Sequence, residues 1–257
     1  MKSKLLASAF ALLALTAAVR ADEYPFKEPF RHAAPFEASG ALSLSSVNGN
    51  VTVVGWDKNE ILIEGEKAAK TKEELDKIDL SIDVSPDHAE LAARLPKRSG
   101  WFFGNTIRGR VTFTIHLPSS ARIEQIDVVN SGVKIDRIHG GATIETVNGG
   151  IDASDVRGSV DLESVNGPLQ VRFSKLDRGD HLSFETVNGP ITVVLPPDAA
   201  VDLETEVVNG RIDCDFPLTL TRSSKRKQLS GTIAGGGARL EAETVNGPIR
   251  IQRGGDS

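Results

Sequence analysis

The sequence predicts an all-β fold, and within that class a parallel β-solenoid whose coils share a Val-Asn-Gly corner. Three observations predict it. The tripeptide recurs along the chain, apolar and polar residues alternate on both sides of each copy, and the copies follow one another at a nearly fixed spacing. Alternation with period two indicates short strands with one buried face. Self-similarity at a fixed period indicates stacked repeats.

Seven copies of the motif place an Asn at the same point of the repeat. They contain Asn48, Asn130, Asn148, Asn166, Asn188, Asn209 and Asn246, and the copy at Asn130 is degenerate. From Asn130 onward the copies follow at steps of about 20 residues, and the last step is nearly twice as long. The positions four before and three after each Asn are apolar in almost every copy, as in Leu162 and Leu169 around Asn166. Each copy therefore predicts two short strands joined at a corner.

Two architectures satisfy this pattern. Asn-Gly between alternating strands is a strong hairpin signal, which would give an antiparallel β meander or sandwich. In a parallel solenoid, like residues would stack about 4.8 Å apart, and the Asn side chains would form a ladder of amides in a buried corner. The repetition of the motif within one chain favours the solenoid, because stacked coils place like residues over like, whereas the strands of a meander do not need to be identical. We expect Asn and Gly to turn the corner by adopting positive φ.

The chain divides into segments by the regularity of the repeat. We expect a linker over residues 22–35, one β-repeat domain over 36–253 and a C-terminal tail over 254–257. Within the domain, residues 55–118 break the period and are expected to form an irregular insertion or cap, and residues 119–253 the regular coils.

Local patterns predict elements inside the insertion and one irregularity outside it. Thr71 to Ile78 begins with a capping box and predicts a short helix. Alternation predicts strands over 60–65, 80–84, 89–95 and 110–117. One extra residue before Asn209 indicates a β-bulge.

The first 21 residues have the pattern of a secretory signal peptide. Lys2 and Lys4 precede an uncharged apolar stretch, and Ala21 offers a small residue at the cleavage point. Removing residues 1–21 takes away three positive charges and lowers the net charge from −5 to −8. No second apolar span follows, so we expect no transmembrane anchor after cleavage and a periplasmic, extracellular or cell-surface location.

Composition excludes several classes of function. Aromatic residues make up 5% of the chain, which is little for a protein that stacks bases or sugars on exposed rings. The negative net charge disfavours nucleic acid as a partner. A single cysteine, Cys214, excludes a disulfide framework and multi-cysteine metal sites, and its place in an alternating run predicts a core position. We expect no cofactor and no metal site.

At this point the sequence resembles a known family. The repeated [Ser/Thr]-Val-Asn-Gly-x-Ile-x-Val motif, the Leu117-Pro118 strand end and the closing run from Gly235 into Thr244-Val245-Asn246-Gly247 are similar to the bacterial putative-adhesin domain family. The resemblance covers about residues 36–253. It implies a secreted or surface β-repeat domain, and it offers no catalytic residues to carry over.

Two sets of residues are candidates for surface contacts. The position three before each motif Asn is acidic in six copies, at Asp127, Glu145, Glu163, Glu185, Glu206 and Glu243. Stacked in register, these carboxylates would form a stripe that binds Ca²⁺ or a basic ligand, or that is simply solvated and resists aggregation. The second interpretation is favoured, since the Gly-Asp-rich pattern of Ca²⁺ repeats is absent. The aromatic cluster Trp101, Phe102 and Phe103 is a candidate ligand contact.

These observations predict an exported, non-catalytic interaction or structural module of the cell envelope, adhesin-like, with an unidentified polymer or protein as partner. The alternative is a polysaccharide hydrolase or lyase that uses clustered carboxylates at Asp152, Asp155 and Asp161. The basic run 222–227 is a further candidate, for contact with an anionic envelope polymer. Oligomeric state is left open.

Overall fold

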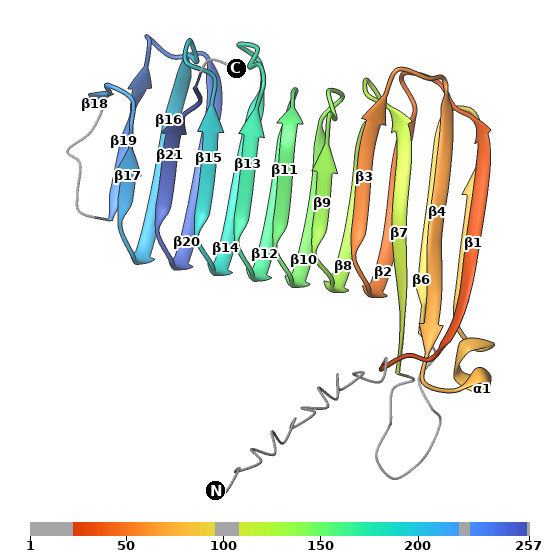
Figure 1. Cartoon of the computed structure of the whole chain (residues 1–257). Coiled ribbons are helices and arrows are strands. Elements are labelled where there is room, and N and C mark those ends of the chain that lie inside the picture. The colour runs from red at the N-terminus through yellow and green to blue at the C-terminus, as the bar shows by residue number, and fades with distance from the viewer. Residues whose placement is uncertain (1–22, 96–107, 221–226, 256–257) are drawn as a thin grey trace, which may run out of the picture.

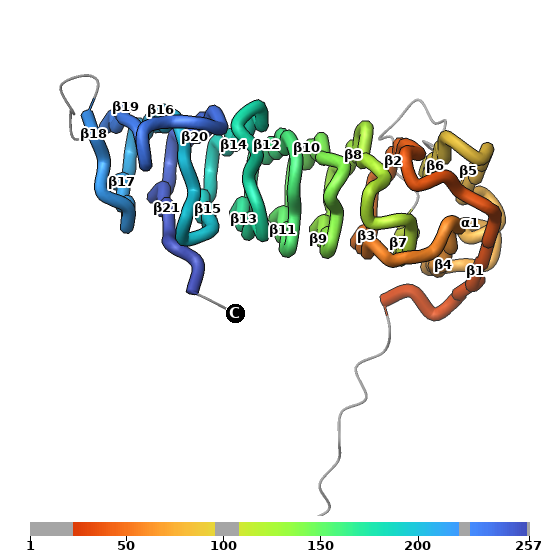
Figure 2. The backbone as a smooth tube through the Cα atoms, turned by 90° about the horizontal axis from the view of Figure 1, so that it is seen from above, coloured from red at the N-terminus to blue at the C-terminus, as the bar shows by residue number. Residues whose placement is uncertain are grey.

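The computed structural model describes residues 23–95, 108–220 and 227–255, and this part of the chain is all-β with one short helix. Two sheets lie face to face and form an elongated stack (Figures 1 and 2). The ten-stranded sheet has the spatial order β1 (Phe26–Pro35), β4 (Glu60–Ala69), β7 (Gly109–Pro118), β3 (Val51–Trp56), β9 (Val133–Asp136), β11 (Ile151–Val156), β13 (Leu169–Phe173), β15 (Ile191–Leu195), β21 (Ile249–Arg253) and β17 (Ile212–Cys214). The eleven-stranded sheet has the order β18 (Thr219–Leu220), β19 (Gln228–Ile233), β16 (Val201–Asn209), β20 (Ala238–Asn246), β14 (His181–Asn188), β12 (Val160–Asn166), β10 (Ala142–Asn148), β8 (Arg122–Asn130), β2 (Ala41–Asn48), β6 (His88–Arg94) and β5 (Asp79–Val84).

Each motif copy supplies one strand to each sheet, and neighbouring copies pair in parallel. β10 pairs with β12 so that Ile144 lies opposite Leu162 and Asn148 opposite Asn166. Inward residues of both sheets, mostly Val, Ile and Leu, form one continuous core between the sheets. Parallel pairing confirms the predicted class of fold. The antiparallel meander is wrong for the repeats, because the two strands of one copy enter different sheets and do not pair with each other as a hairpin.

The order of coils in the stack differs from their order in the chain. The last coil, β20 and β21, lies between the coil of β14 and β15 and the coil of β16 and β17. At the other end, β2 and β3 lie between β6 and β7 on one side and β8 and β9 on the other. The described chain therefore begins with β1 at one end of the stack and enters the stack with β2 and β3. It returns to that end with β4 to β7, and from β8 onward it extends the stack in the other direction (Figure 2).

Antiparallel strands cover much of both ends of the stack. β1 pairs with β4, β4 with β7 and β5 with β6, all antiparallel, and at the far end β19 pairs antiparallel with β16 and β18 with β19. Such end strands limit edge-to-edge pairing with other chains. Residues 55–118 thus form the expected cap in part, but β6 and β7 add a further coil that pairs in parallel with β2 and β3.

The short helix is present where the capping box predicts it. α1 (Lys72–Leu75) begins after Thr71, whose hydroxyl accepts a hydrogen bond of 3.2 Å from the backbone N–H of Glu74. The four strands predicted in this region are also present, as β4, β5, β6 and β7. None of the helices in the described ranges is long and apolar enough to cross a membrane.

Two local predictions are wrong. Residues 26–35 of the predicted linker form β1, an edge strand whose residues are almost all solvent-accessible. The predicted bulge before Asn209 is absent, since β16 and β20 pair without a shift from Val201 to Asn209. The apparent extra residue arises because polar Thr205 faces the interior, where its hydroxyl donates to the carbonyl of Leu229 over 3.3 Å. Register shifts occur instead at β8, β11 and their neighbours.

The glycines of the motif serve a different purpose from the one predicted. Among the described motif residues, only Gly49 has a positive φ, of 113°. At Gly149, Gly167, Gly189 and Gly247, a Cβ would overlap the backbone carbonyl group of the adjacent coil. Glycine is therefore required because neighbouring coils approach each other closely at the corner.

Candidate binding surface

The seven motif asparagines form one ladder of side-chain amides along the stack. Each Nδ2 donates to the Oδ1 of the next Asn at 2.8–2.9 Å, and the line ends where Asn48 donates to the carbonyl of Gly109 at 3.0 Å. In spatial order the members are Asn48, Asn130, Asn148, Asn166, Asn188, Asn246 and Asn209. The corner is exposed and not buried as predicted, except at half-buried Asn48. The ladder therefore fixes the spacing of the coils at a surface edge.

A second ladder explains the Ser or Thr of the motif. This residue, two before the Asn, points inward and is buried in five copies, at Ser46, Thr146, Ser164, Thr186 and Thr244. In the last four, the hydroxyl donates to a backbone carbonyl at the corner of the neighbouring coil in the stack, over 3.1–3.2 Å. Two kinds of hydrogen bond thus connect the five coils from Asn130 to Asn246, so this part of the corner edge is held in one register.

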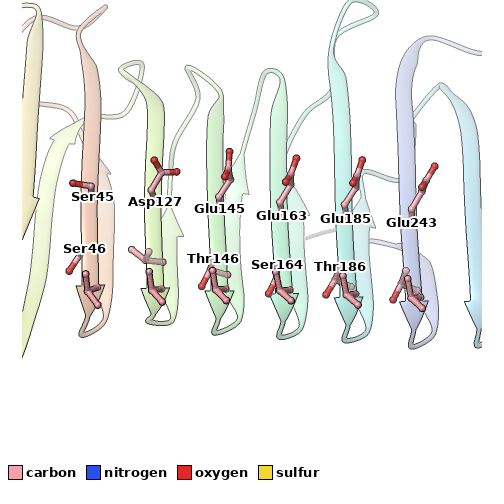
Figure 3. Close-up of a pocket in the computed structure, with 18 of the residues that line it drawn as sticks. Ser45, Ser46, Asp127, Glu145, Thr146, Glu163, Ser164, Glu185, Thr186 and Glu243 are labelled. Carbon is pink, nitrogen blue, oxygen red and sulfur yellow. The ribbon is translucent and has the colours of Figure 1, made fainter. Parts of the chain in front are cut away.

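The predicted acidic stripe is real and lies on the outer face of the eleven-stranded sheet. We call it the acidic column: in spatial order Asp127, Glu145, Glu163, Glu185, Glu243 and Glu206. Figure 3 shows five of these carboxylates in one row above the Ser and Thr side chains. Like charges directly opposite one another in a sheet repel.

Few groups of the protein neutralise the acidic column. Toward its two ends, the carboxylates accept hydrogen bonds from glutamine side chains. Gln125 donates to Asp127 at 2.7 Å and to Glu145 at 3.1 Å, and Gln228 donates to Glu206 at 2.8 Å. Within the described part of the chain, the carboxylates of Glu163, Glu185 and Glu243 have no hydrogen bond or ion pair. The middle of the column therefore lacks counter-charges.

The pKa values of two glutamates record this environment. Desolvation raises the pKa of Glu163, and the charges of Asp161, Glu185 and Glu145 add to the effect. The pKa of Glu243 is raised in the same way, first by desolvation and then by Glu185, Glu206 and other acidic neighbours. Ionisation of these two glutamates in the folded protein therefore costs more free energy than in water.

Sequence reasoning missed a column of valines beside the acidic column. The valine column consists of the motif valines, one before each Asn: Val47, Val129, Val147, Val165, Val187, Val245 and Val208. Six of them are 38–47% exposed, and they are six of the eight large hydrophobic side chains that are exposed in the described structure. The sequence does contain a signal for this column. The residues one and three before each Asn are two apart on a strand, so the valine must face outward together with the acidic residue.

The two columns line one shallow groove that runs across the strands. It has a volume of 640 Å³ and extends from Val47 and Arg94 at one end to Val208 and Glu206 at the other. Its lining combines both columns with the inward Ser and Thr positions between them. Contiguous exposed apolar surface rimmed by polar groups marks interaction sites in soluble proteins.

The remaining candidates do not form a site. Trp101, Phe102, Phe103, the predicted signal peptide and most of the basic run 222–227 lie outside the described residues. Asp152 is on β11 and Asp161 on β12, in opposite sheets with outward positions, so the structure does not bring them together.

The remaining residues to consider are those that could bind a metal ion and the single thiol. In residues 23–95, 108–220 and 227–255, no group of His, Cys, Asp or Glu side chains could hold a metal ion. Cys214 is half-buried and packs against the core, and burial raises the pKa of its thiol.

Comparison with known proteins agrees with this architecture. Residues 131–252 match the family model described as Toastrack DUF4097. No protein with a curated description matches the sequence.

The solved structures that resemble the chain are similar over most of its length. The structure of a putative cell adhesion protein from Clostridium sporogenes ATCC 15579 has a TM-score of 0.53 and 15% identity, and the match covers 88% of this chain and 100% of that one. A putative adhesin from Parabacteroides merdae ATCC 43184 matches with a TM-score of 0.37 and 8% identity, over 87% of this chain and 96% of that one. The first of these likenesses supports the fold. Together with the motif copies, the family match over residues 131–252 confirms the resemblance of this chain to the putative-adhesin domain family.

Proposed function

We propose that this protein is an exported module of the cell envelope that binds a polymer or protein partner through the groove and catalyses no reaction. The observation that carries the proposal is the groove itself, because it places a row of exposed valines beside a row of carboxylates whose three middle members, Glu163, Glu185 and Glu243, are unpaired. The similar structure from Clostridium sporogenes is described as a putative cell adhesion protein, which supports a binding role. The signal-peptide pattern of residues 1–21 supports export.

The stacking supports a binding role because it makes the surface rigid. The amide ladder connects each coil to the next, and the hydroxyl ladder adds a second bond between the five coils from Asn130 to Asn246. The residues of the groove sit on strands of that framework and not on loops. A surface already held in its binding geometry loses little conformational entropy when a partner binds.

The polysaccharide-cleaving alternative has less support. Glycoside hydrolysis uses two carboxyl groups that flank the scissile bond. The carboxylates of the acidic column repeat at equivalent positions in one row, so no two of them are set apart as an acid and a base. Of the three carboxylates that the sequence suggested, Asp152 and Asp155 lie on β11 and Asp161 lies on β12 in the opposite sheet.

The test compares binding to isolated bacterial envelopes by co-sedimentation. The full-length chain is compared with a groove variant, Glu145→Lys/Glu185→Lys, and with Asp152→Lys on the opposite sheet as the control. We expect the groove variant to lose binding and the control to keep it. The groove substitutions remove like-charge repulsion, so they should not unfold the protein. Equal binding by all three proteins contradicts the proposal.

Turnover is measured in parallel. The same proteins are incubated with soluble polysaccharides, and new reducing ends are counted. We expect none above the buffer control. Release of reducing ends that the groove variant abolishes would establish the enzymatic alternative instead.

A further inference from the structure

We propose that the groove binds a basic amphipathic helix of a partner protein, which lies across the strands with its apolar side on the valine column and its Lys or Arg side chains against the acidic column. This inference rests on the proposed function and names the chemistry of the partner. It follows from the dimensions of the groove, its charge and the identity of its exposed apolar groups.

The dimensions of the groove fit a helix. Neighbouring coils lie about 4.8 Å apart, so the seven valines extend over about 29 Å. A helix rises 1.5 Å per residue, so about 19 residues span that length. One helical turn advances about 5.4 Å, which brings an apolar side chain to nearly every coil. The two columns are two residues apart on each strand, about 7 Å, a separation that neighbouring faces of one helix can reach.

Charge decides which kind of helix fits. Glu163, Glu185 and Glu243 have no counter-charge on the described part of the chain, and burial, followed by repulsion from acidic neighbours, raises the pKa values of Glu163 and Glu243. A row of cations would satisfy these carboxylates in their charged form. Anionic polymers, nucleic acid and anionic lipid would add to the repulsion, so they are disfavoured as occupants.

A second copy of this chain fits less well than a helix. Two grooves facing each other would bring two acidic columns together, and like charges across an interface suppress association. The valines alone would favour such a pair, because they are most of the exposed large hydrophobic side chains of the described structure. A partner that supplies both apolar and basic groups satisfies both columns at once.

The test is a titration of the full-length chain with a synthetic 19-residue peptide of Leu, Lys and Ala. Its Leu residues follow a period of 3.6, and its Lys residues occupy the adjacent face. A scrambled peptide of the same composition and an acidic version with Glu for Lys are the controls. Binding is measured by calorimetry at two salt concentrations, and the helix content of the peptide by circular dichroism.

Two groove variants separate the two columns. Val165→Thr/Val187→Thr keeps the shape and the β-branched side chains but makes the valine column polar, and it should weaken binding about tenfold. Glu163→Gln/Glu185→Gln removes two charges and should weaken binding about threefold to tenfold, less at high salt. Val54→Thr and Asp152→Asn, on the outward face of the other sheet, are the matched controls and should leave the affinity unchanged.

The expected result is binding of the amphipathic peptide with a gain of helix, weakened by both groove variants and by neither control. Equal binding of the scrambled peptide overturns the inference, because it would show unspecific attraction of charge. Self-association of the protein that Val165→Thr/Val187→Thr abolishes also overturns it, in favour of a second copy. Absence of peptide binding overturns it while leaving the proposed function intact if envelope binding still requires the groove; if envelope binding is also independent of the groove, both proposals fail.

Discussion

Interrupting the Asn ladder at its middle tests whether the corner stabilises the stack. Asn166 donates to Asn148 at 2.9 Å and accepts from Asn188 at 2.8 Å, so Asn166→Ala removes two hydrogen bonds. A hydrogen bond contributes about 0.5–1.5 kcal/mol net. The side chain is exposed, and water can replace the lost partners, so we expect a loss at the lower end, about 1–2 kcal/mol of unfolding free energy.

Asn209, at the end of the ladder, provides the matched comparison. It makes a single ladder bond, to Asn246 at 2.9 Å. Asn209→Ala should therefore cost about half as much as Asn166→Ala. The assay is urea denaturation, in which a shift of the midpoint at constant slope reports a change in stability. A cost for Asn166→Ala no larger than for Asn209→Ala would refute the reasoning.

Three further predictions concern single residues. Gly167→Ala should destabilise the protein by about 3 kcal/mol, because its Cβ would overlap the carbonyl of Gly149, whereas Gly179→Ala, with open space around it, should be tolerated in the same denaturation assay. Glu163→Gln should stabilise the protein by about 0.2–1 kcal/mol at pH 7. The raised pKa of Glu163 means that its charge opposes folding above that pKa, so the gain should shrink as the pH falls through it and disappear below the ordinary value of 4.5. Cys214 should react slowly with iodoacetamide at pH 8 in the native protein and faster after unfolding, because burial raises the pKa of its thiol; equal rates would contradict this.

Much of the fold could be predicted because the interior imposes one rule on every coil. Positions an even number of residues before the Asn face inward, so their apolar character shows the strands directly. β1 escaped prediction for the same reason: in this edge strand only Phe30 and Ala34 are partly buried against the core, which is too few to leave an alternating pattern. The order of the coils also escaped prediction, since copies with the same corner fit on one another equally well and the motif does not encode which two become neighbours.

Only one of the two columns of the candidate site was predicted from the sequence. The acidic column was visible in the sequence because an acidic residue recurs three positions before the Asn, and the structure places those carboxylates in one row (Figure 3). The valine column was hidden because Val-Asn-Gly was treated only as a corner. Val147 belongs to β10 and faces outward with Glu145, as parity requires. The absence of counter-charges depends on which strands become neighbours in space, and that is not visible in one sequence.

Uniformity of the coils has a consequence for recognition. A partner helix of about 12 residues would span about 18 Å, or four coils, and seven coils would offer it about four overlapping registers. Four registers of equal affinity would favour binding by about 0.8 kcal/mol over one, which is the upper bound here because the registers cover different numbers of unpaired carboxylates. All four present the same row of valines, so the groove would select a pattern of apolar and basic residues and not a particular sequence. The repetition that stabilises the corner therefore also favours a broad class of partners, which is the property expected of a surface that mediates attachment.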